Sequence, residues 1–415
     1  MPPEKAINIE DLRRAAKRRL PRVIFDFIDG GAEAEHCLRT NEDGFLRHCL
    51  VPRYLVDVTS PRQRVEILGQ SFASPFGIAP TGLAALARPG ADDMLAEAAA
   101  DADVPFIISG AATSTIANLA RIAPKAWYQL YPARTDAVSL DLAKRAADAG
   151  LSTLVVTVDV PTHSKRERNA RHGWSIGGPG RPPLGVAVEA LRHPTWVASY
   201  MRHGLPRLEN WVPYAGGERD PRKLLAFFAS QVPCPHDWRL IERLRNVWNG
   251  KLVVKGILHP DDATRAVEAG VDGMIVSNHG GRQLDRAPSS VEMLPLVRDA
   301  VGPGVTLMLD SGIRRGSDIA ISLCLGASAC FVGRATLFGV AAAGRAGAVR
   351  ALTILRQELD LCLAQIGCPD VAELAPAFLL DEVGRKAART GSKLEVATLL
   401  RDSKARLDTR SSASR

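Results

Sequence analysis

Gly273-Met274-Ile275-Val276-Ser277-Asn278-His279-Gly280-Gly281-Arg282-Gln283-Leu284-Asp285 is the stretch from which both the fold and the site are interpreted. Its first four residues form a short apolar run of the kind that is buried as a strand. A histidine and an arginine, three residues apart, follow at once on a glycine-containing loop. Polar and basic side chains at the end of a buried strand indicate a site, in which histidine handles a proton and arginine binds an anion.

Seven further apolar, β-rich runs share this character: Phe76–Ala79, Phe106–Ile108, Trp127–Leu130, Thr153–Val158, Leu252–Val254, Val305–Leu309 and Ala329–Val332. Stretches with helical spacing lie between most of them: Asp92–Ala102, Asp136–Ala149, Asp261–Ala269, Val291–Ala300 and Ser317–Leu325. Strands that alternate with helices in this way predict a parallel sheet closed into a (β/α)8 TIM barrel. A doubly wound open sheet is the alternative, but no strand opens with Gly-x-Gly-x-x-Gly.

The remaining segments are expected to be additions to this barrel. A helix from Glu10 to Ile28 should be broken or restarted at Pro21, and an amphipathic helix at Gly347–Ile366 should cover the barrel. The expected division is an N-terminal helical and extended segment at 1–75, the barrel at 76–345 with an insert at 162–236, C-terminal helices at 346–407 and a flexible tail at 408–415.

Composition limits the class of protein. The 415 residues are 46% hydrophobic and 24% charged, as in a soluble globular protein, and no apolar run is long enough to span a membrane. The net charge of +8 fits an acidic substrate, an anionic membrane surface or nucleic acid. Nucleic acid is not expected as a partner, because only 5% of the residues are aromatic. The seven cysteines lack metal-type spacing, so we expect reduced thiols in the cytoplasm and no metal site.

The insert after the fourth strand is unusually long for a loop of such a barrel. From Thr162 to Asp220 it carries nine Lys and Arg against five Asp and Glu, and it holds three of the six tryptophans. A basic segment with apolar and Trp faces can lie in a membrane interface, here through residues 173–212. A lid or an oligomer contact is the alternative interpretation.

Polar or glycine-bearing residues end all eight predicted strands. Active sites of such barrels lie at these ends, so the set predicts one large polar ligand across the mouth. Its members are Pro80, Thr81 and Gly82, then Ser109, Gln129 with Tyr131, Thr157 with Asp159, Lys255, Ser277 with His279 and Arg282, Asp310, Ser311, Gly312, Ile313 and Arg314, and Gly333 with Arg334.

The chemistry of this set indicates flavin mononucleotide (FMN). The last two strands are followed by glycines with Arg314 and Arg334, which suit a phosphate. Lys255 ends an apolar strand, where it needs an anion or a polar ring beside it. Neutral hydrogen-bonding groups nearby suit the edge of a flavin. His279 is then the candidate base, and Asp159 would orient it. Arg166 and Arg282 would bind a substrate carboxylate.

These residues resemble those of the FMN-dependent α-hydroxy-acid dehydrogenase/oxidase family, from about Ile9 to Pro376. The resemblance rests on SNHGGRQLD, TVDVPTHSKRER, LVVKG, DSGIRRGSD and VGRATL in the family's order. Within the family, the chain is most similar to the membrane-associated (S)-mandelate and L-lactate dehydrogenases. LRHPTWVASYMRHGLPRLENW in the insert and LAQIGCPD near the C-terminus resemble the mandelate enzymes most. The resemblance implies oxidation of an (S)-2-hydroxy acid to a 2-oxo acid, with electrons passed to a quinone or another membrane acceptor. It also implies a homo-oligomer that is peripheral on the inner face of the cell membrane.

The same resemblance assigns roles. His279 and Asp159 are implied to be catalytic, Tyr131, Arg166 and Arg282 to hold the substrate, and Lys255 to face the flavin. The other strand-end residues would bind FMN. Gly82 indicates a dehydrogenase, because the family's oxidases tend to have alanine there.

Phe27 departs from the family pattern, which usually has a substrate-binding tyrosine after the aspartate. Loss of that hydroxyl would typically cost about 1.5–3 kcal/mol of binding. The affinity is then weaker, another donor compensates, or the substrate is a larger hydroxy-acid metabolite. Two further alternatives have other grounds: an oxygen-using oxidase, and a non-catalytic membrane-surface binding protein, which the basic Trp-bearing insert motivates.

Overall fold

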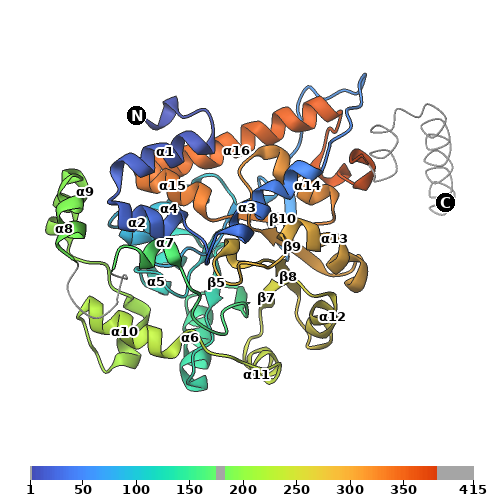
Figure 1. The fold of residues 1–415 in the computed structure, drawn as a ribbon. Coiled ribbons are helices and arrows are strands. Elements are labelled where there is room, and N and C mark those ends of the chain that lie inside the picture. The colour runs from blue at the N-terminus through green and yellow to red at the C-terminus, as the bar shows by residue number, and fades with distance from the viewer. Residues whose placement is uncertain (1, 174–182, 381–415) are drawn as a thin grey trace.

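The computed structural model describes residues 2–173 and 183–380 (Figure 1). The membrane segment expected at 173–212 lies partly outside the described residues, at 174–182. Of the expected C-terminal helices and tail, everything from 381 to 415 lies outside them as well.

Eight parallel strands form the barrel in the order β3-β10-β9-β8-β7-β6-β5-β4. A parallel bridge between Ile78 and Phe106 joins the first strand to the start of the second, so the sheet closes. The strands are β3 Phe76–Ile78, β4 Ile107–Ile108, β5 Trp127–Leu130, β6 Thr153–Thr157, β7 Lys251–Ile257, β8 Gly273–Val276, β9 Thr306–Asp310 and β10 Ala329–Val332. The TIM barrel prediction is confirmed, and the open-sheet alternative is wrong.

Both faces of each strand are apolar because both are buried. Trp127, Val155 and Val253 point into the barrel, whereas their neighbours Tyr128 and Leu154 belong to the layer between sheet and helices. This double burial produces the continuous apolar runs of the sequence. A hairpin, β1 Val65–Ile67 and β2 Gln70–Phe72, packs Ile67 and Phe72 against the interior layer.

The outer layer consists of helices that follow the strands: α4 Ala91–Asp101, α5 Ile116–Ile122, α6 Asp136–Asp148, α11 Arg239–Val247, α12 Pro260–Glu268, α13 Ser290–Val301, α14 Gly316–Cys324 and α15 Arg334–Ala343. The sequence interpretation missed α15. Residues Ala335–Ala341 of α15 are all buried, since α1 Ile9–Arg19 and α16 Arg345–Ile366 pack over it. A helix buried all round has no apolar stripe to reveal it.

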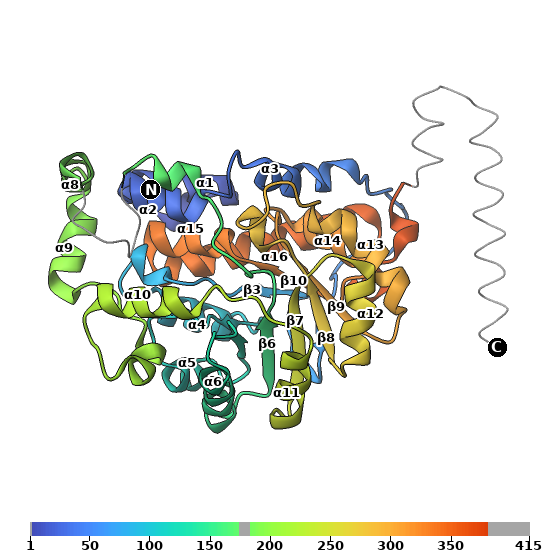
Figure 2. The same ribbon diagram turned by 60° about the horizontal axis from the view of Figure 1, so that its bottom comes forward.

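The N-terminal segment contributes α1 Ile9–Arg19, α2 Arg22–Asp29 and α3 His36–Asp43. The predicted break at Pro21 is confirmed, because Pro21 is the N-cap of α2. These helices lie along one side of the barrel with α15 and α16 (Figures 1 and 2).

The insert forms α7 Glu167–Ala170, α8 Leu184–Leu191, α9 Pro194–His203, the 3-10 turn η4 Glu209–Ala215 and α10 Pro221–Gln231. Helices α8 and α9 project from the barrel beside α2 (Figure 2). The division of the chain at residues 75 and 345 stays a prediction.

Candidate active site

A cavity of about 400 Å³ opens at the carboxyl ends of the strands. Among the predicted residues, the cavity is lined by Phe27, Pro80, Thr81, Gly82, Tyr131, Thr157, Arg166, Lys255, His279, Arg282, Asp310, Ser311, Gly312, Ile313, Arg314, Gly333 and Arg334. Four predicted residues lie outside this lining: Ser109, Gln129, Asp159 and Ser277. Three of them hydrogen-bond to residues that line the cavity, Ser109 to Ala111, Asp159 to His279 and Ser277 to Lys255. Gln129 instead accepts from the backbone of Gly110, which precedes the lining residue Ala111. The structure thus brings the predicted set together, while the role of each residue stays a prediction.

Strand geometry explains why these side chains meet. Side chains two residues apart in a strand point to the same face, so the residue two positions after an inward-facing apolar residue also points inward. Val155 is followed by Thr157, and Val253 is followed by Lys255. The same spacing joins Trp127 to Gln129, Ile275 to Ser277 and Met308 to Asp310. A polar layer therefore lies directly above the apolar filling of the barrel.

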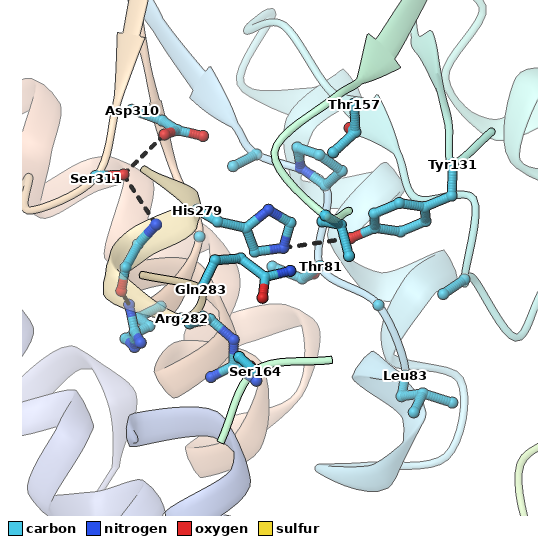
Figure 3. A pocket seen from close by; sticks show the side chains of 18 of the residues that line it. Thr81, Leu83, Tyr131, Thr157, Ser164, His279, Arg282, Gln283, Asp310 and Ser311 are labelled. Carbon is cyan, nitrogen blue, oxygen red and sulfur yellow. Dashed lines mark hydrogen bonds between the residues drawn. The ribbon is translucent and has the colours of Figure 1, made fainter. Parts of the chain in front are cut away.

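His279 lies at the centre of the cavity (Figure 3). Its Nδ1 is 2.8 Å from Asp159 Oδ1, and its Nε2 is 3.4 Å from the Tyr131 hydroxyl. The carboxylate fixes the ring orientation, which leaves Nε2 toward the cavity. His279 has a positive φ of 59°, a backbone state that is uncommon for residues other than glycine and that clusters at functional sites.

Lys255 is buried among oxygen atoms. Its Nζ donates to Ser277 Oγ at 2.8 Å and lies 3.1 Å from Asp310 Oδ2 and 3.9 Å from Asp159 Oδ2. Burial alone would lower the pKa of Lys255, but Asp310 and Asp159 outweigh it and raise the pKa. Burial likewise opposes ionisation of Asp159, yet His279 and Lys255 bring its pKa below the usual range. Both groups are therefore charged at neutral pH.

Two partly buried guanidinium groups bind the carbonyl end of α2. Arg282 donates to the carbonyls of Phe27 and Gly30, each at 2.9 Å. Arg334 donates to the carbonyl of Gly30 at 2.8 Å and to that of Ile28 at 3.1 Å. The carboxyl end of a helix carries partial negative charge, which favours cations there.

These two cations have no carboxylate within 4.0 Å among residues 2–173 and 183–380. Burial, together with Arg314, lowers the pKa of Arg334 to about 10. Burial and the neighbouring Arg166 and Arg334 lower the pKa of Arg282 well below its ordinary value. An anion in the cavity would favour the charged forms of both arginines and so oppose the lowering of their pKa values. The charge distribution therefore favours an anionic ligand.

Phe27 lies beside both proposed carboxylate clamps. The guanidinium carbons of Arg166 and Arg282 are 5.8 Å and 5.3 Å from the centre of its ring. Such cation–π contacts hold the two charges near each other, although like charges repel. Two converging guanidiniums are suited to a carboxylate.

The loop after β9, which is predicted to bind the phosphate, lies close to α3. Gly312 has a φ of 89°, and a Cβ there would lie 2.1 Å from the carbonyl oxygen of Asn41, so only glycine fits. Arg314 forms an ion pair with Glu42 at 2.9 Å. Of the two arginines predicted to bind the phosphate, Arg334 therefore has the less neutralised charge.

Unsatisfied buried polar atoms test whether FMN fits. Gln129 accepts from the backbone N–H of Gly110 at 3.0 Å, while its Nε2 and the Thr157 hydroxyl have no partner among the described residues. Buried polar groups are normally hydrogen-bonded. Donors at the cavity floor with cations at the rim match the polar ring edge and phosphate of FMN.

Sequence reasoning missed several residues that line the cavity: Leu83, Ala111, Leu225, Phe228, Val232 and Gln283. Gln283 extends toward the cavity beside His279 (Figure 3). Leu225, Phe228 and Val232 follow helical spacing, which could have identified a shared face but not its place at the mouth.

Comparison with known proteins agrees with this geometry. Residues 16–381 match the family described as FMN-dependent dehydrogenase. The chain is 38% identical to (S)-mandelate dehydrogenase of Pseudomonas putida over 91% of this chain and 95% of the relative. It is 37% identical to L-lactate dehydrogenase of Caulobacter vibrioides over 90% of this chain and 98% of that protein.

Solved structures include one described as the monotopic membrane protein (S)-mandelate dehydrogenase. It superposes with a TM-score of 0.87 at 38% sequence identity, and the match covers 91% of this chain and 100% of the other. The predicted cofactor and enzyme class are thereby confirmed, and the alternative of a non-catalytic binding protein is set aside. The chain belongs to the FMN-dependent dehydrogenase family.

Proposed function

We propose that this FMN-dependent dehydrogenase oxidises a 2-hydroxy acid to the corresponding 2-oxo acid. The observation that carries the proposal is the placement of His279 Nε2 in the same cavity as the guanidiniums of Arg166 and Arg282. A proton acceptor beside two cations suits an acid with a hydroxyl group next to its carboxylate. Mandelate and lactate, after which the compared dehydrogenases are named, are both such acids.

The side chains have distinct proposed roles. Arg166 and Arg282 bind the carboxylate, the Tyr131 hydroxyl hydrogen-bonds to the substrate, and His279 Nε2 removes the proton. Asp159 holds the ring and stabilises the imidazolium that forms. FMN, when bound, accepts the two electrons.

Individual residues are proposed to hold FMN through the chemistry of their polar groups. Arg314 and Arg334 face the phosphate with the loop Ser311-Gly312-Ile313, and Lys255 faces the polar edge of the ring. The neutral contacts are Pro80, Thr81, Gly82, Ser109, Gln129, Thr157, Ser277 and Gly333. Asp310, whose carboxylate pairs with Lys255, completes the proposed set.

Anaerobic flavin reduction tests the reaction. Purified protein should be yellow, and its flavin absorbance should bleach with (S)-mandelate, L-lactate or another (S)-2-hydroxy acid. The His279→Gln variant should keep the colour and lose bleaching. A protein that binds no FMN, or a His279→Gln variant that turns over normally, would contradict the proposal.

A quinone or another membrane acceptor is proposed to take the electrons. The reduced protein should then reoxidise faster with a soluble quinone than with oxygen. Faster reoxidation by oxygen would favour the alternative of a 2-hydroxy-acid oxidase. Failure of all simple acids to bleach a loaded flavin would favour a larger hydroxy-acid substrate, an alternative that Phe27 motivates.

Peripheral membrane binding, at the cytoplasmic face, is proposed for the α8–α9 face. Leu184, Leu191 and Met201 have exposed fractions of 80%, 69% and 83%, and Arg192 and Arg202 lie among them. Apolar and basic side chains together suit an anionic lipid interface. Within the part of the chain that the structure describes, no helix is long and apolar enough to cross a bilayer.

Sedimentation with anionic vesicles tests the membrane proposal. Leu191→Glu with Met201→Glu should release the protein from the vesicles, whereas Leu361→Glu should not, although Leu361 on α16 is also 62% exposed. Vesicle binding unaffected by the double change would contradict docking through the α8–α9 face. An unchanged protein that does not bind vesicles at all would favour a lid or an oligomer contact.

A homo-oligomer is also proposed. Leu46, Tyr54 and Leu55, each at least 79% exposed, are the candidate contacts. A monomeric mass by light scattering would contradict this proposal.

A further inference from the structure

The active-site cavity is asymmetric. Arg282 lies on one side of His279, and Tyr131 and Leu83 lie on the other (Figure 3). Phe228 of α10 is on the Tyr131 side, because the two ring centres are 6.3 Å apart at an angle of 74°. The cavity therefore has a cationic side and an apolar side, with the candidate base between them.

Helix α10 supplies much of the apolar side. Leu225 and Phe228 both line the cavity and are only partly buried. Val232, which follows the helix, continues the same face. Residues three, four and seven apart lie on one side of a helix, so a single helical face closes this part of the mouth.

Phe228 is held by a buried aromatic partner. The ring centre of Trp211 lies 4.8 Å from that of Phe228 at an angle of 83°, an edge-to-face contact. Trp211 is fully buried, and its Nε1 donates to the carbonyl of Gly110 at 2.8 Å. The β4–α5 loop thus anchors Trp211, and Trp211 fixes the position of the Phe228 ring.

We propose that Phe228 and Leu225, backed by Trp211, form a specificity wall for an apolar substituent larger than methyl on the substrate's hydroxyl-bearing carbon. This inference rests on the proposed function. An acid whose carboxylate contacts Arg166 and Arg282, and whose hydroxyl-bearing carbon lies at His279, directs its remaining substituent toward the Tyr131 side. Aromatic and branched or long alkyl acids would bury that substituent against α10, while a methyl group would not reach it.

The size of the effect follows from the loss of apolar contact. Changing one methylene in an apolar pocket alters kcat/KM by about 10- to 200-fold. Phe228→Ala should therefore lower kcat/KM for a phenyl-substituted acid by about 10- to 100-fold. The value for L-lactate should change much less, because its methyl group makes no contact with the ring.

Phe227→Ala is the matched control. Phe227 is the adjacent residue of the same helix and is also partly buried, but it does not line the cavity. A general loss of folding or of α10 packing would affect both variants and all substrates alike. The decisive quantity is therefore the ratio of kcat/KM for (S)-mandelate to that for L-lactate, compared between the two holoenzyme variants.

A second measurement does not depend on turnover. Phenylacetate and acetate can be titrated into the FMN-loaded protein while the visible flavin spectrum reports their dissociation constants. The original protein should bind phenylacetate more tightly, and Phe228→Ala should remove most of that preference while Phe227→Ala keeps it. An equal preference in all three proteins, or an unchanged mandelate-to-lactate ratio in Phe228→Ala, overturns the proposal.

The two proposals fail separately. If no 2-hydroxy acid reduces the flavin, the proposed function fails, and the carboxylate titration still tests the wall. If acids reduce the flavin without dependence on Phe228, the function stands and the specificity wall is wrong.

Discussion

Asp159 Oδ1 lies 2.8 Å from His279 Nδ1 and fixes the imidazole of the candidate base. Asp159→Asn would keep the shape but remove the charge that stabilises the imidazolium, so the rate of flavin reduction should fall by about 10²- to 10⁴-fold. Anaerobic stopped-flow absorbance measures this rate. The exposed Asp261→Asn variant is the control, and a normal rate in Asp159→Asn would remove Asp159 from its proposed role.

The strand-end residues could be predicted because the topology leaves them little choice. Once eight parallel strands close, all their carboxyl ends meet at one rim, and the two-residue spacing directs Thr157 and Lys255 inward above Val155 and Val253. His279 and its neighbours follow β8 directly. Local sequence and topology therefore sufficed for most of the cavity.

Other parts depend on contacts that sequence spacing does not encode. Phe228 reaches the cavity only because a long insert returns along α10 and Trp211 anchors it. The carbonyls of α2 that bind Arg282 and Arg334 lie about 250 and 300 residues away along the chain. Neither arrangement has a local periodic signal, so both require the folded structure.

Lys255 gives a pH-dependent prediction. The raised pKa of Lys255 contributes stability that is fully present below the unfolded pKa of about 10.4 and is lost as pH rises through the folded pKa. The lowered pKa of Asp159 contributes stability that is present above the unfolded pKa of about 3.9 and is lost as pH falls through the folded pKa. Lys255→Met removes the cation beside the buried carboxylate of Asp310 and should cost about 3–5 kcal/mol of the free energy of unfolding. Denaturant unfolding should show this loss as nearly constant from about pH 5 to 9 and smaller at both extremes. A steady growth of the difference with rising pH would contradict the assignment.

Arg334 predicts that FMN-free protein is stabilised by simple anions. Inorganic phosphate at about 100 times its dissociation constant should add about 2.7 kcal/mol, seen as a rise in Tm. Arg334→Met should lose most of this rise, because the hydrogen-bond partners of the Arg334 guanidinium in the described part of the chain are all carbonyls, which it can exchange for the anion. Arg315→Met should keep it, since the exposed Arg315 pairs with Glu358 at 2.8 Å. Equal phosphate effects in both variants would contradict the anion site.

Phe27→Tyr tests the departure from the family pattern. A hydroxyl added beside Arg166 and Arg282 can donate to a bound carboxylate, a hydrogen bond to a charged group being worth about 1.5–3 kcal/mol. Acetate should therefore bind the FMN-loaded variant about 10- to 100-fold more tightly, as measured by perturbation of the flavin spectrum. Unchanged affinity would show that the ring edge at position 27 does not face the carboxylate site.

Arg168 should act on the substrate through Arg166. Arg168 donates to Asp29 Oδ2 at 2.6 Å and also binds Glu35, and Asp29 is buried and paired with Arg13 at 2.6 Å as well. This network fastens α7, whose N-cap is Arg166, to the end of α2.

Arg168→Gln should cost about 1–3 kcal/mol of stability. It should also raise KM more than it lowers kcat, because the carboxylate-binding Arg166 is held less firmly while His279 and Asp159 stay in place. Arg171→Gln is the control, since the Arg171 side chain is 77% exposed and, among residues 2–173 and 183–380, forms an ion pair with Glu167 alone. Equal changes of KM in the two variants would show that the ionic network does not position Arg166.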